Sequence, residues 1–258
     1  MLNRALLKQE LSLRCPAAEE IHLCLYDCID STNTEAKRMA ADAKAPMTLL
    51  AADAQSAGRG RMGRSFYSPS ATGVYFSLLY TAQAPMTSAV TVTSAAAVAV
   101  MRAVERLCGI RCSIKWVNDL YLENKKIAGI LAESVSCGEQ HSIVLGIGIN
   151  LTTESFPEDL SFVAGSLGKE LPMTREALIA EIFSQLYPYI QDATDASWLS
   201  DYRASSMVLG KRIRWSDPKG GFLEGTAEDI APSGALIAKD DAGCLYTLST
   251  GEITLRLC

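Results

Sequence analysis

The feature that most constrains the fold is a change of pattern after Met207. Before it, apolar segments with helical spacing alternate with strand-like runs, as in α+β domains. After it, five short strand-like runs are separated by turns rich in Gly, Pro and Asp, a rhythm typical of a small β-barrel. We therefore predict an α+β domain over residues 1–205 and a small β domain over residues 206–258. The five runs are KRIRW, FLEGTAEDI, ALIAKD, CLYTLS and EITLRL.

Three helices are expected in the first part, over residues 31–43, 88–108 and 174–190. The first begins with Thr32 and Glu35 at the spacing of a capping box, and the third with Thr174 as its N-cap. Strand patterns are MTLLAADA, VYFSLLY, SIKWV, DLYL, KIAGILAESV and HSIVLGIGIN. Short polar turns separate the last four of these runs, which therefore predict antiparallel neighbours.

Charge and cysteine content exclude several classes of protein. The chain has 24 Lys plus Arg against 29 Asp plus Glu, and this balance disfavours a general affinity for DNA or an anionic membrane. The longest apolar stretch, Ala89–Met101, is too short to span a bilayer, and the charged N-terminus does not resemble a signal peptide. The eight cysteines are scattered and only two histidines occur. We therefore predict a cytoplasmic protein with free, buried thiols and without a structural zinc site.

A glycine and arginine run, AGRGRMGRSFYSPSATG, lies between two strand patterns. No acidic residue occurs between Asp53 and Glu105, whereas Arg59, Arg61, Arg64 and Arg102 all fall there. The string GRGRMG fits GxGxxG, but a strand follows it instead of a helix and the expected acidic residue is missing, which argues against a dinucleotide-binding turn. No Walker A motif is present. Two readings stay open at this point: a loop that wraps a polyanion with backbone N–H groups and guanidiniums, and a solvated surface loop.

Further polar residues interrupt the strand patterns. If KWVND continues a strand, Lys115 and Val117 face one side, and Trp116 and Asn118 face the other. The neighbours Lys125 and Lys126 likewise point to opposite sides, so only one of them can enter a pocket. The two glycines of VLGIGIN weaken a strand unless a ligand or a packed element approaches the bare backbone closely.

In this order, Ser31-Thr32-Asn33, Gln55 with GRGRMGR, KWVND, KIAGIL, GIGIN and the closing GEITLR resemble biotin protein ligase from Tyr26 to the C-terminus. The resemblance implies a catalytic domain similar to class II aminoacyl-tRNA synthetases and an SH3-like C-terminal module. It also implies two steps: biotin and ATP give biotinyl-5′-AMP, and a lysine of a biotin carboxyl carrier domain then takes the biotinyl group. Some members of the family begin with a DNA-binding domain. Only about 25 residues precede the matching part here, so we expect no such domain.

The resemblance also implies roles for individual residues. The biotin site would comprise Ser31, Thr32, Asn33, Gln55, Gly58, Arg59, Gly60, Arg61 and Lys126. The ATP site would comprise Arg61, Arg64, Lys115, Asn118, Lys126 and Asn150. Arg59, Arg61, Lys115 and Lys126 would be catalytic, and Asp119 would hold Mg²⁺. A carrier domain of a carboxylase is the expected partner, and a homodimer is possible.

This sequence departs from the family's pattern at three positions. Val117 replaces the usual proline of KWPND, Phe66 stands where tryptophan is common, and Met62 interrupts a frequent second arginine pair. None of these changes removes an expected polar contact, but Val117 puts the backbone that aims Asn118 and Asp119 in doubt. Two alternatives remain: a lipoate or octanoate ligase of related fold, whose RRxSGGG-type loop is not found here, and a non-catalytic biotin-binding module.

Overall fold

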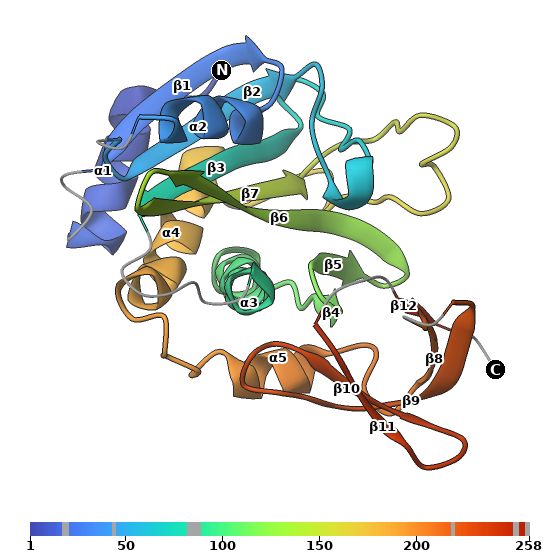
Figure 1. The fold of residues 1–258 in the computed structure, drawn as a ribbon. Coiled ribbons are helices and arrows are strands. Elements are labelled where there is room, and N and C mark those ends of the chain that lie inside the picture. Colours follow the sequence, from blue (N-terminus) through green and yellow to red (C-terminus); the bar gives the residue numbers. More distant parts are fainter. Residues whose placement is uncertain (17–20, 43–44, 82–88, 218–219, 250–252, 256–258) are drawn as a thin grey trace.

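The protein folds around two β-sheets (Figure 1). The computed structural model describes residues 1–16, 21–42, 45–81, 89–217, 220–249 and 253–255. The large sheet has seven strands in the order β1-β2-β3-β7-β6-β5-β4, in which β1 and β2 are parallel and all other neighbours are antiparallel. This arrangement confirms the antiparallel strands expected between residues 113 and 150. The strands are β1 (His22–Ile29), β2 (Thr48–Gln55), β3 (Gly73–Thr81), β4 (Ser113–Lys115), β5 (Asp119–Leu122), β6 (Lys125–Cys137) and β7 (Gln140–Asn150).

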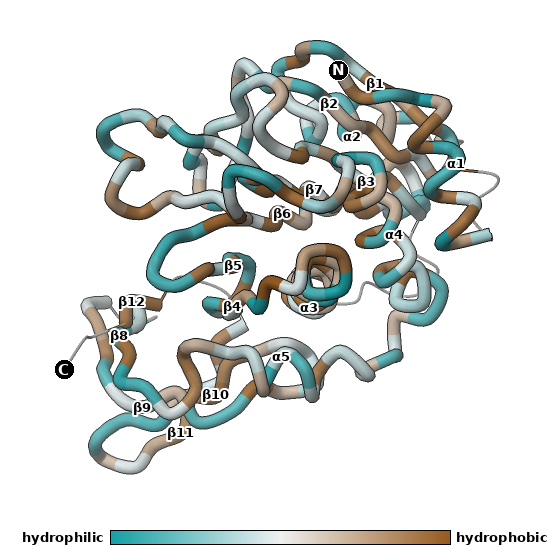
Figure 2. The backbone as a smooth tube through the Cα atoms, turned by 180° about the vertical axis from the view of Figure 1, so that it is seen from behind, coloured by the Kyte–Doolittle hydropathy of each residue, from teal (hydrophilic) through white to brown (hydrophobic). Residues whose placement is uncertain are grey.

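Helices cover both faces of the large sheet. On one face, α2 (Thr32–Ala40) packs over β2, β3 and β7, where Leu50, Leu79 and Val144 meet its alanines. On the other face lie α3 (Ala89–Cys108) and α4 (Arg175–Gln191), with α1 (Arg4–Arg14) packed on α4. Because both faces are buried, β2 and β3 are nearly continuous apolar runs rather than alternating ones. Figure 2 shows α3 end-on, beside the strands β6 and β7 of the large sheet.

The second sheet is antiparallel, with its strands in the order β11-β10-β9-β8-β12, and it confirms the five expected strands. Trp116 Nε1 donates to the carbonyl of Gly234 at 2.9 Å, and Met207 N donates to Ile114 O at 3.0 Å. Short α5 (Leu199–Ser205) lies between the two parts (Figure 1). The hydrogen bonds of Trp116 and Met207 hold the second sheet against the edge of the first sheet that carries β4. The strands are β8 (Arg212–Ser216), β9 (Phe222–Ile230), β10 (Leu236–Asp240), β11 (Leu245–Leu248) and β12 (Ile253–Leu255).

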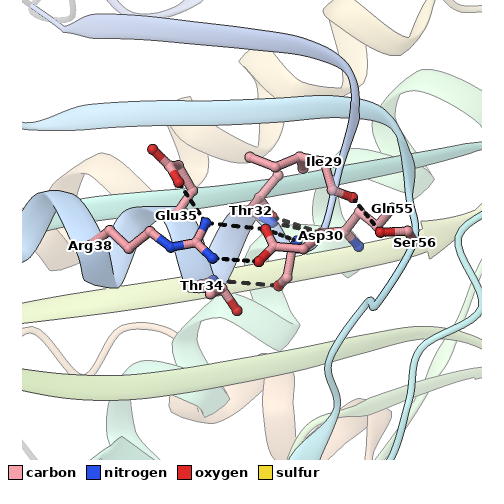
Figure 3. Close-up of polar contacts among 9 residues, drawn as sticks. Ile29, Asp30, Thr32, Thr34, Glu35, Arg38, Gln55 and Ser56 are labelled. Carbon is pink, nitrogen blue, oxygen red and sulfur yellow. Dashed lines mark hydrogen bonds and ion pairs between the residues drawn. The ribbon is translucent and has the colours of Figure 1, made fainter.

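One helix start differs from the expectation. The N-cap of α2 is Ser31, whose hydroxyl accepts from Thr34 N at 3.4 Å, and Thr32 is already the first helical residue. The predicted capping box of Thr32 and Glu35 is therefore wrong. Glu35 instead pairs with Arg38, which also binds Asp30 at the end of the loop that precedes the helix (Figure 3). Thr32 is thus free of a capping role and turns its side chain toward Gln55. The N-cap at Thr174 of α4 is confirmed, since its hydroxyl accepts from Ala177 N.

Sequence patterns missed α1, β1 and α5. The N-terminal helix buries only Leu7 and Leu11, and seven of the eight residues of β1 are partly or fully exposed, so neither gives a strong periodic signal. The seven cysteines among the described residues are free, as expected, but only Cys15 and Cys112 are buried, so the expectation of buried thiols is wrong for the other five. Cys258 and the expected helix start at Ser88 lie outside the described residues. Among the described residues, no helix combines the length and the apolar character that crossing a membrane requires.

Candidate active site

A cavity of about 470 Å³ opens where α2, the strands β2, β6 and β7, the glycine and arginine loop, residues 156–164 and β12 meet. It brings together residues that are far apart in the chain. Of the predicted site residues, Gly58 alone does not line it. A Cβ at Gly58 would lie 2.4 Å from the carbonyl oxygen of Phe66, so this glycine packs against the returning strand of its own loop. The predicted residues that line the cavity are Ser31, Thr32, Asn33, Gln55, Arg59, Gly60, Arg61, Arg64, Lys115, Asn118, Asp119, Lys126 and Asn150.

One end of the cavity, which we call the neutral end, is formed by Ser31, Thr32, Asn33 and Gln55. Gln55 Oε1 accepts from Thr32 N at 2.9 Å (Figure 3). Gln55 Nε2 donates to the hydroxyl of Ser68 at 2.9 Å, and that hydroxyl donates to Phe66 O. Because both ends of the Gln55 amide are engaged, its orientation is fixed.

Asn33 lies on the bare backbone of β7. A Cβ at Gly146 would stand 1.9 Å from Asn33 Oδ1, so only glycine leaves room for the amide there. Asn33 Oδ1 is 2.6 Å from the hydroxyl of Ser77, and Asn33 Nδ2 donates to Glu133 Oε2 at 3.1 Å. The expectation that something approaches the glycines of VLGIGIN closely is thus confirmed, and here the approaching group is a side chain.

The glycine and arginine loop is a tight hairpin. Gly60 N donates to Arg64 O at 2.7 Å and Phe66 N donates to Gly58 O at 2.9 Å. At its tip, Met62 and Gly63 have positive φ values of 54° and 74°, and the side chain of Met62 is exposed. The hairpin holds Arg59 against Glu133 at 3.3 Å and Arg61 against Asn118 Oδ1 at 3.1 Å. These contacts favour the ligand-wrapping reading of the loop over a solvated one.

Phe66 fills the space above two further glycines. A Cβ at Gly148 would lie 2.6 Å from its ring, and a Cβ at Gly129 would lie 3.4 Å from it. The ring meets Tyr75 edge to face, with centroids 6.3 Å apart. Phe66 therefore forms an apolar wall of the cavity on glycines of β6 and β7.

The other end, which we call the cationic end, is formed by Arg59, Arg61, Arg64, Lys115 and Lys126. Lys126 Nζ lies 2.6 Å from Asp119 Oδ1, so the two strands β5 and β6 hold this cation in place. Lys125 points the other way and donates to the carbonyls of Ser161 and Phe162. The expectation that only one of these two lysines enters a pocket is confirmed.

The predicted alternation along KWVND is wrong. β4 ends at Lys115 and a turn follows, so the two-residue period of a strand does not extend to Asn118. Lys115 and Asn118 consequently both line the cavity, although they were assigned to opposite faces. Trp116 and Val117 are buried, and Val117 O accepts from the hydroxyl of Tyr202 at 3.2 Å. Asn118 Nδ2 donates a hydrogen bond to the carbonyl of Ile130 at 3.1 Å. The amide is therefore held in the cavity although Val117 occupies the position of the usual proline.

Two further polar groups lie beside these ends: Asn150, which is buried, and Glu133, which is half-buried. Asn150 Nδ2 donates to Gly165 O at 3.0 Å, and its Oδ1 is buried with no hydrogen-bond partner among the described residues. Burial acts to raise the pKa of Glu133, but hydrogen bonds from Lys37 and Asn33 and the charge of Arg59 outweigh it and leave the pKa below its usual value. Glu133 is thus a carboxylate at neutral pH.

Sequence reasoning missed some of the lining residues. Ile253 and Thr254 reach the cavity from β12 of the second sheet, and Phe156 and Leu160 reach it from the segment after β7. Ile253 and Thr254 belong to the GEITLR run, which supported the resemblance but was given no role in a site. No local motif marks Phe156 and Leu160, because their role depends on how distant segments meet. Arg102, although it falls in the acid-free stretch, does not join the cavity and binds Asp201 at 2.7 Å.

Two family models match the chain. The model described as biotin/lipoate A/B protein ligase family matches residues 25–150, and the model described as biotin protein ligase C terminal domain matches residues 208–256. The biotin–[acetyl-CoA-carboxylase] ligase of Mycobacterium tuberculosis is 31% identical over 233 residues, covering 86% of this chain and 85% of the relative. Its namesake from Paracoccus denitrificans is 32% identical over 227 residues, covering 83% and 92%. The chain therefore belongs to the biotin protein ligase family.

Two further matches differ in what they cover. The bifunctional ligase/repressor BirA of Bacillus spizizenii is 38% identical over 151 residues, which are 57% of this chain but 46% of that protein. The chain thus spans about half the length of this relative. Among solved structures, biotin protein ligase from Aquifex aeolicus in complex with biotin and ATP has a TM-score of 0.77 at 24% identity, covering 91% of this chain and 98% of that one. This likeness confirms an α+β fold with a mixed sheet and a C-terminal antiparallel sheet.

Proposed function

We propose that this protein is an ATP-dependent ligase that activates biotin as biotinyl-5′-AMP and transfers the biotinyl group to a lysine of a biotin carboxyl carrier domain. One observation carries the proposal: a single cavity joins the neutral end to the cationic end. The neutral end suits a neutral ring with amide-like groups, and the cationic end suits a carboxylate beside a triphosphate. The names of the relatives from Mycobacterium tuberculosis and Paracoccus denitrificans, of which the chain covers 85% and 92%, agree with this reading.

The roles of the residues follow from the two ends. Ser31, Thr32, Asn33 and Gln55 bind the ring of biotin, and Gly58 and Gly60 shape the loop that closes over it. Arg59, Arg61 and Lys126 bind the biotin carboxylate, and Arg61, Arg64, Lys115 and Lys126 bind the phosphates. Asn118 holds Arg61, and Asn150 offers its buried Oδ1 to the nucleotide.

The chemistry is mainly electrostatic in this proposal. In the first step the biotin carboxylate attacks the α-phosphorus of ATP, the acyl phosphate bond forms and pyrophosphate leaves. Both reactants are anions, so fixed cations and backbone N–H groups lower the barrier by offsetting their repulsion and by aligning them. In the second step the neutral amine of a carrier lysine attacks the acyl carbon and AMP leaves. Neither step requires a histidine base, and neither of the two histidines, His22 and His141, lines the cavity.

Mg²⁺ fits the cationic end through one side chain. In the described part of the chain no three His, Cys, Asp or Glu side chains gather as a metal site, and Asp119 is the one acid that lines the cavity. Mg²⁺ commonly takes one or two carboxylates and completes its shell with substrate phosphates and water. Asp119 would therefore hold it together with ATP, and the ion would neutralise phosphate charge.

Finer features of the architecture belong to the same proposal. We place the boundary between domains at residues 205 and 206, where α5 ends and before β8 begins. The five short antiparallel strands support an SH3-like module, and the mixed sheet with helices on both faces supports a catalytic domain similar to class II aminoacyl-tRNA synthetases. Since the reaction needs ATP, we propose the cytoplasm as its location.

The test is incubation of the full chain with ATP, Mg²⁺, biotin and a biotin carboxyl carrier domain, followed by intact mass measurement of the carrier. The expected result is a mass increase of one biotinyl group that requires ATP. ATP–pyrophosphate exchange with biotin and with lipoate separates the two ligase classes, and we expect exchange with biotin only. Binding of biotin without exchange would instead support a non-catalytic module.

A further inference from the structure

Glu133, on β6, stands just behind the neutral end of the cavity. Its carboxylate contacts three side chains from two elements: Lys37 at 2.9 Å and the Asn33 amide at 3.1 Å, both of α2, and Arg59 of the loop at 3.3 Å. It does not line the cavity itself. Its side chain is one-fifth exposed, so any effect on a ligand must pass through the residues that it contacts.

The first step concerns the direction of the Asn33 amide. An ionised carboxylate only accepts hydrogen bonds, so the amide atom that faces Glu133 must be the donor Nδ2. The carbonyl of Leu131, 3.4 Å away, faces the same Nδ2 atom and acts in the same direction. Asn33 Oδ1 is thereby turned toward Ser77, which is fully buried.

The second step follows the hydrogen of Ser77. Asn33 Oδ1 has no hydrogen to donate, so the 2.6 Å contact requires that Ser77 donates its only hydroxyl hydrogen to Asn33. Ser77 Oγ also lies 2.8 Å from Thr32 Oγ1. With the Ser77 hydrogen already committed, this second contact is a hydrogen bond only if Thr32 donates.

The third step considers the other neighbour of Thr32. Gln55 Oε1 is 3.2 Å from Thr32 Oγ1 and is also an acceptor, because Ser68 fixes the opposite end of that amide. Ser77 Oγ is the nearer of the two acceptors, at 2.8 Å, and Gln55 Oε1 already accepts from Thr32 N. The Thr32 hydrogen is therefore directed to Ser77 and stays inside the protein. Thr32 Oγ1, which lines the cavity, therefore offers a ligand only its lone pairs.

Ser31 has the opposite character. Its hydroxyl oxygen accepts from Thr34 N as the cap of α2, and no acceptor for its own hydrogen is found among the described residues. It therefore offers a hydrogen to the cavity. Side by side, a donor at Ser31 and an acceptor at Thr32 match the adjacent C=O and N–H of a cyclic urea or amide.

We propose that Glu133 is a positioning residue that, through Asn33 and Ser77, fixes Thr32 as an acceptor and so selects a ligand with an N–H group at that point. The inference rests on the proposed function and names the feature of the ring that the neutral end reads. Without the Glu133 contact the Asn33 amide can turn over, Ser77 can donate to Thr32, and the Thr32 hydrogen can face the ligand.

The test compares biotin with the two cyclic carbamates in which oxygen replaces one or the other ring N–H. ATP–pyrophosphate exchange gives KM and kcat for each ligand. For the unmodified chain we expect one carbamate to have a KM at least roughly tenfold above that of biotin, since it sets two acceptors against each other. Ser77→Ala leaves Thr32 only the longer contact with Gln55, so it should lower this KM ratio several-fold toward one while kcat with saturating biotin stays within about twofold. Glu133→Gln should lower the ratio in part, because a glutamine amide can still accept from Asn33.

Two further variants complete the design. Lys37→Met leaves the Asn33–Glu133 contact in place and should keep the ratio of the unmodified chain. Thr32→Val keeps the shape of the side chain without a hydroxyl and should abolish the ratio, which keeps the proposal testable if Ser77→Ala does not fold. An equal rise in KM for all three ligands in Ser77→Ala, or loss of the ratio in Lys37→Met, overturns the inference. Absence of exchange with biotin in the unmodified chain contradicts the proposed function instead.

Discussion

At the neutral end of the cavity the polar side chains bind one another, whereas at the cationic end they are held by contacts that a ligand can replace. Thr32 and Asn33 are at most 4% exposed, and they are tied to Gln55 and Ser77. The side chains of Arg59 and Lys126 are 40% and 32% exposed, and each contacts one carboxylate. A phosphate oxygen can take the place of the Asp119 carboxylate beside Lys126, because both are anionic acceptors for the ammonium group. The comparison indicates fixed recognition at one end and exchange of charge at the other.

The largest effect is expected from Lys126→Ala. Loss of one preorganised group typically costs ~10²–10³ in rate, so pyrophosphate release with saturating biotin and ATP should fall by that factor while the melting temperature changes little. Arg61→Ala should behave in the same way. Lys125→Ala is the matched control, since its side chain faces away and binds the carbonyls of Ser161 and Phe162. Near-normal pyrophosphate release by Lys126→Ala would remove this lysine from the proposed machinery.

At the neutral end, Gly146→Ala should have the next largest effect. The new Cβ would stand 1.9 Å from Asn33 Oδ1, so the amide must move and the network with Ser77 must break. We expect the KM for biotin to rise by at least roughly tenfold and stability to fall by about 1–3 kcal/mol, as for other overpacked sites. Gly168→Ala, whose Cβ would make ordinary contacts of 3.7 Å, serves as the control. KM for biotin and denaturation midpoints measure both effects, and equal values for the two variants would contradict the fixed neutral end.

The difference between the two ends also explains what the sequence could reveal. Local patterns predicted most strands of the large sheet and all five of the second, because each is a short apolar run between turn residues. They also predicted that only one of Lys125 and Lys126 enters a pocket, since neighbours on a strand face opposite sides. The choice of Lys126 came from the family resemblance. The contacts that align the neutral end cross long stretches of sequence, such as Asn33 to Glu133, and leave no local pattern.

Two predictions from the sequence were wrong for the same physical reason. The N-cap of α2 was predicted at Thr32 but lies at Ser31. Both residue types are good N-caps, and only the contact of Thr32 with Gln55 decides between them. The faces of KWVND were misassigned because β4 ends at Lys115, where the chain turns inward to bury Trp116 and meet Gly234. Tertiary contacts overrode a local rule in both cases.

Ligand binding should change the two ends unequally, and limited trypsin digestion can detect it. The loop from Arg59 to Arg64 carries three trypsin sites, and its tip residue Met62 is 72% exposed. We expect biotin plus ATP to slow cleavage there several-fold, since closure of a lid over a reactive intermediate keeps water out. Lys169, with an 85% exposed side chain outside the cavity lining, is the internal reference. Equal slowing at both positions would mean that the ligands stabilise the whole protein and do not order the loop in particular.

The smallest effect concerns acid stability at the neutral end. The pKa of Glu133 in the folded protein lies below its usual value, because its hydrogen bonds and neighbouring cations outweigh burial. A depressed folded pKa stabilises the protein above the unfolded value of ~4.3, and this contribution is lost as pH falls through the folded pKa. The urea midpoint should therefore fall more steeply below about pH 5 in the unmodified chain than in Glu133→Gln. The variant should be the less stable of the two at pH 7, and the two midpoints should converge in acid. Parallel curves would indicate that Glu133 is no better stabilised as a carboxylate in the folded chain than in the unfolded one, and the direction of the Asn33 amide would then lack its electrostatic cause.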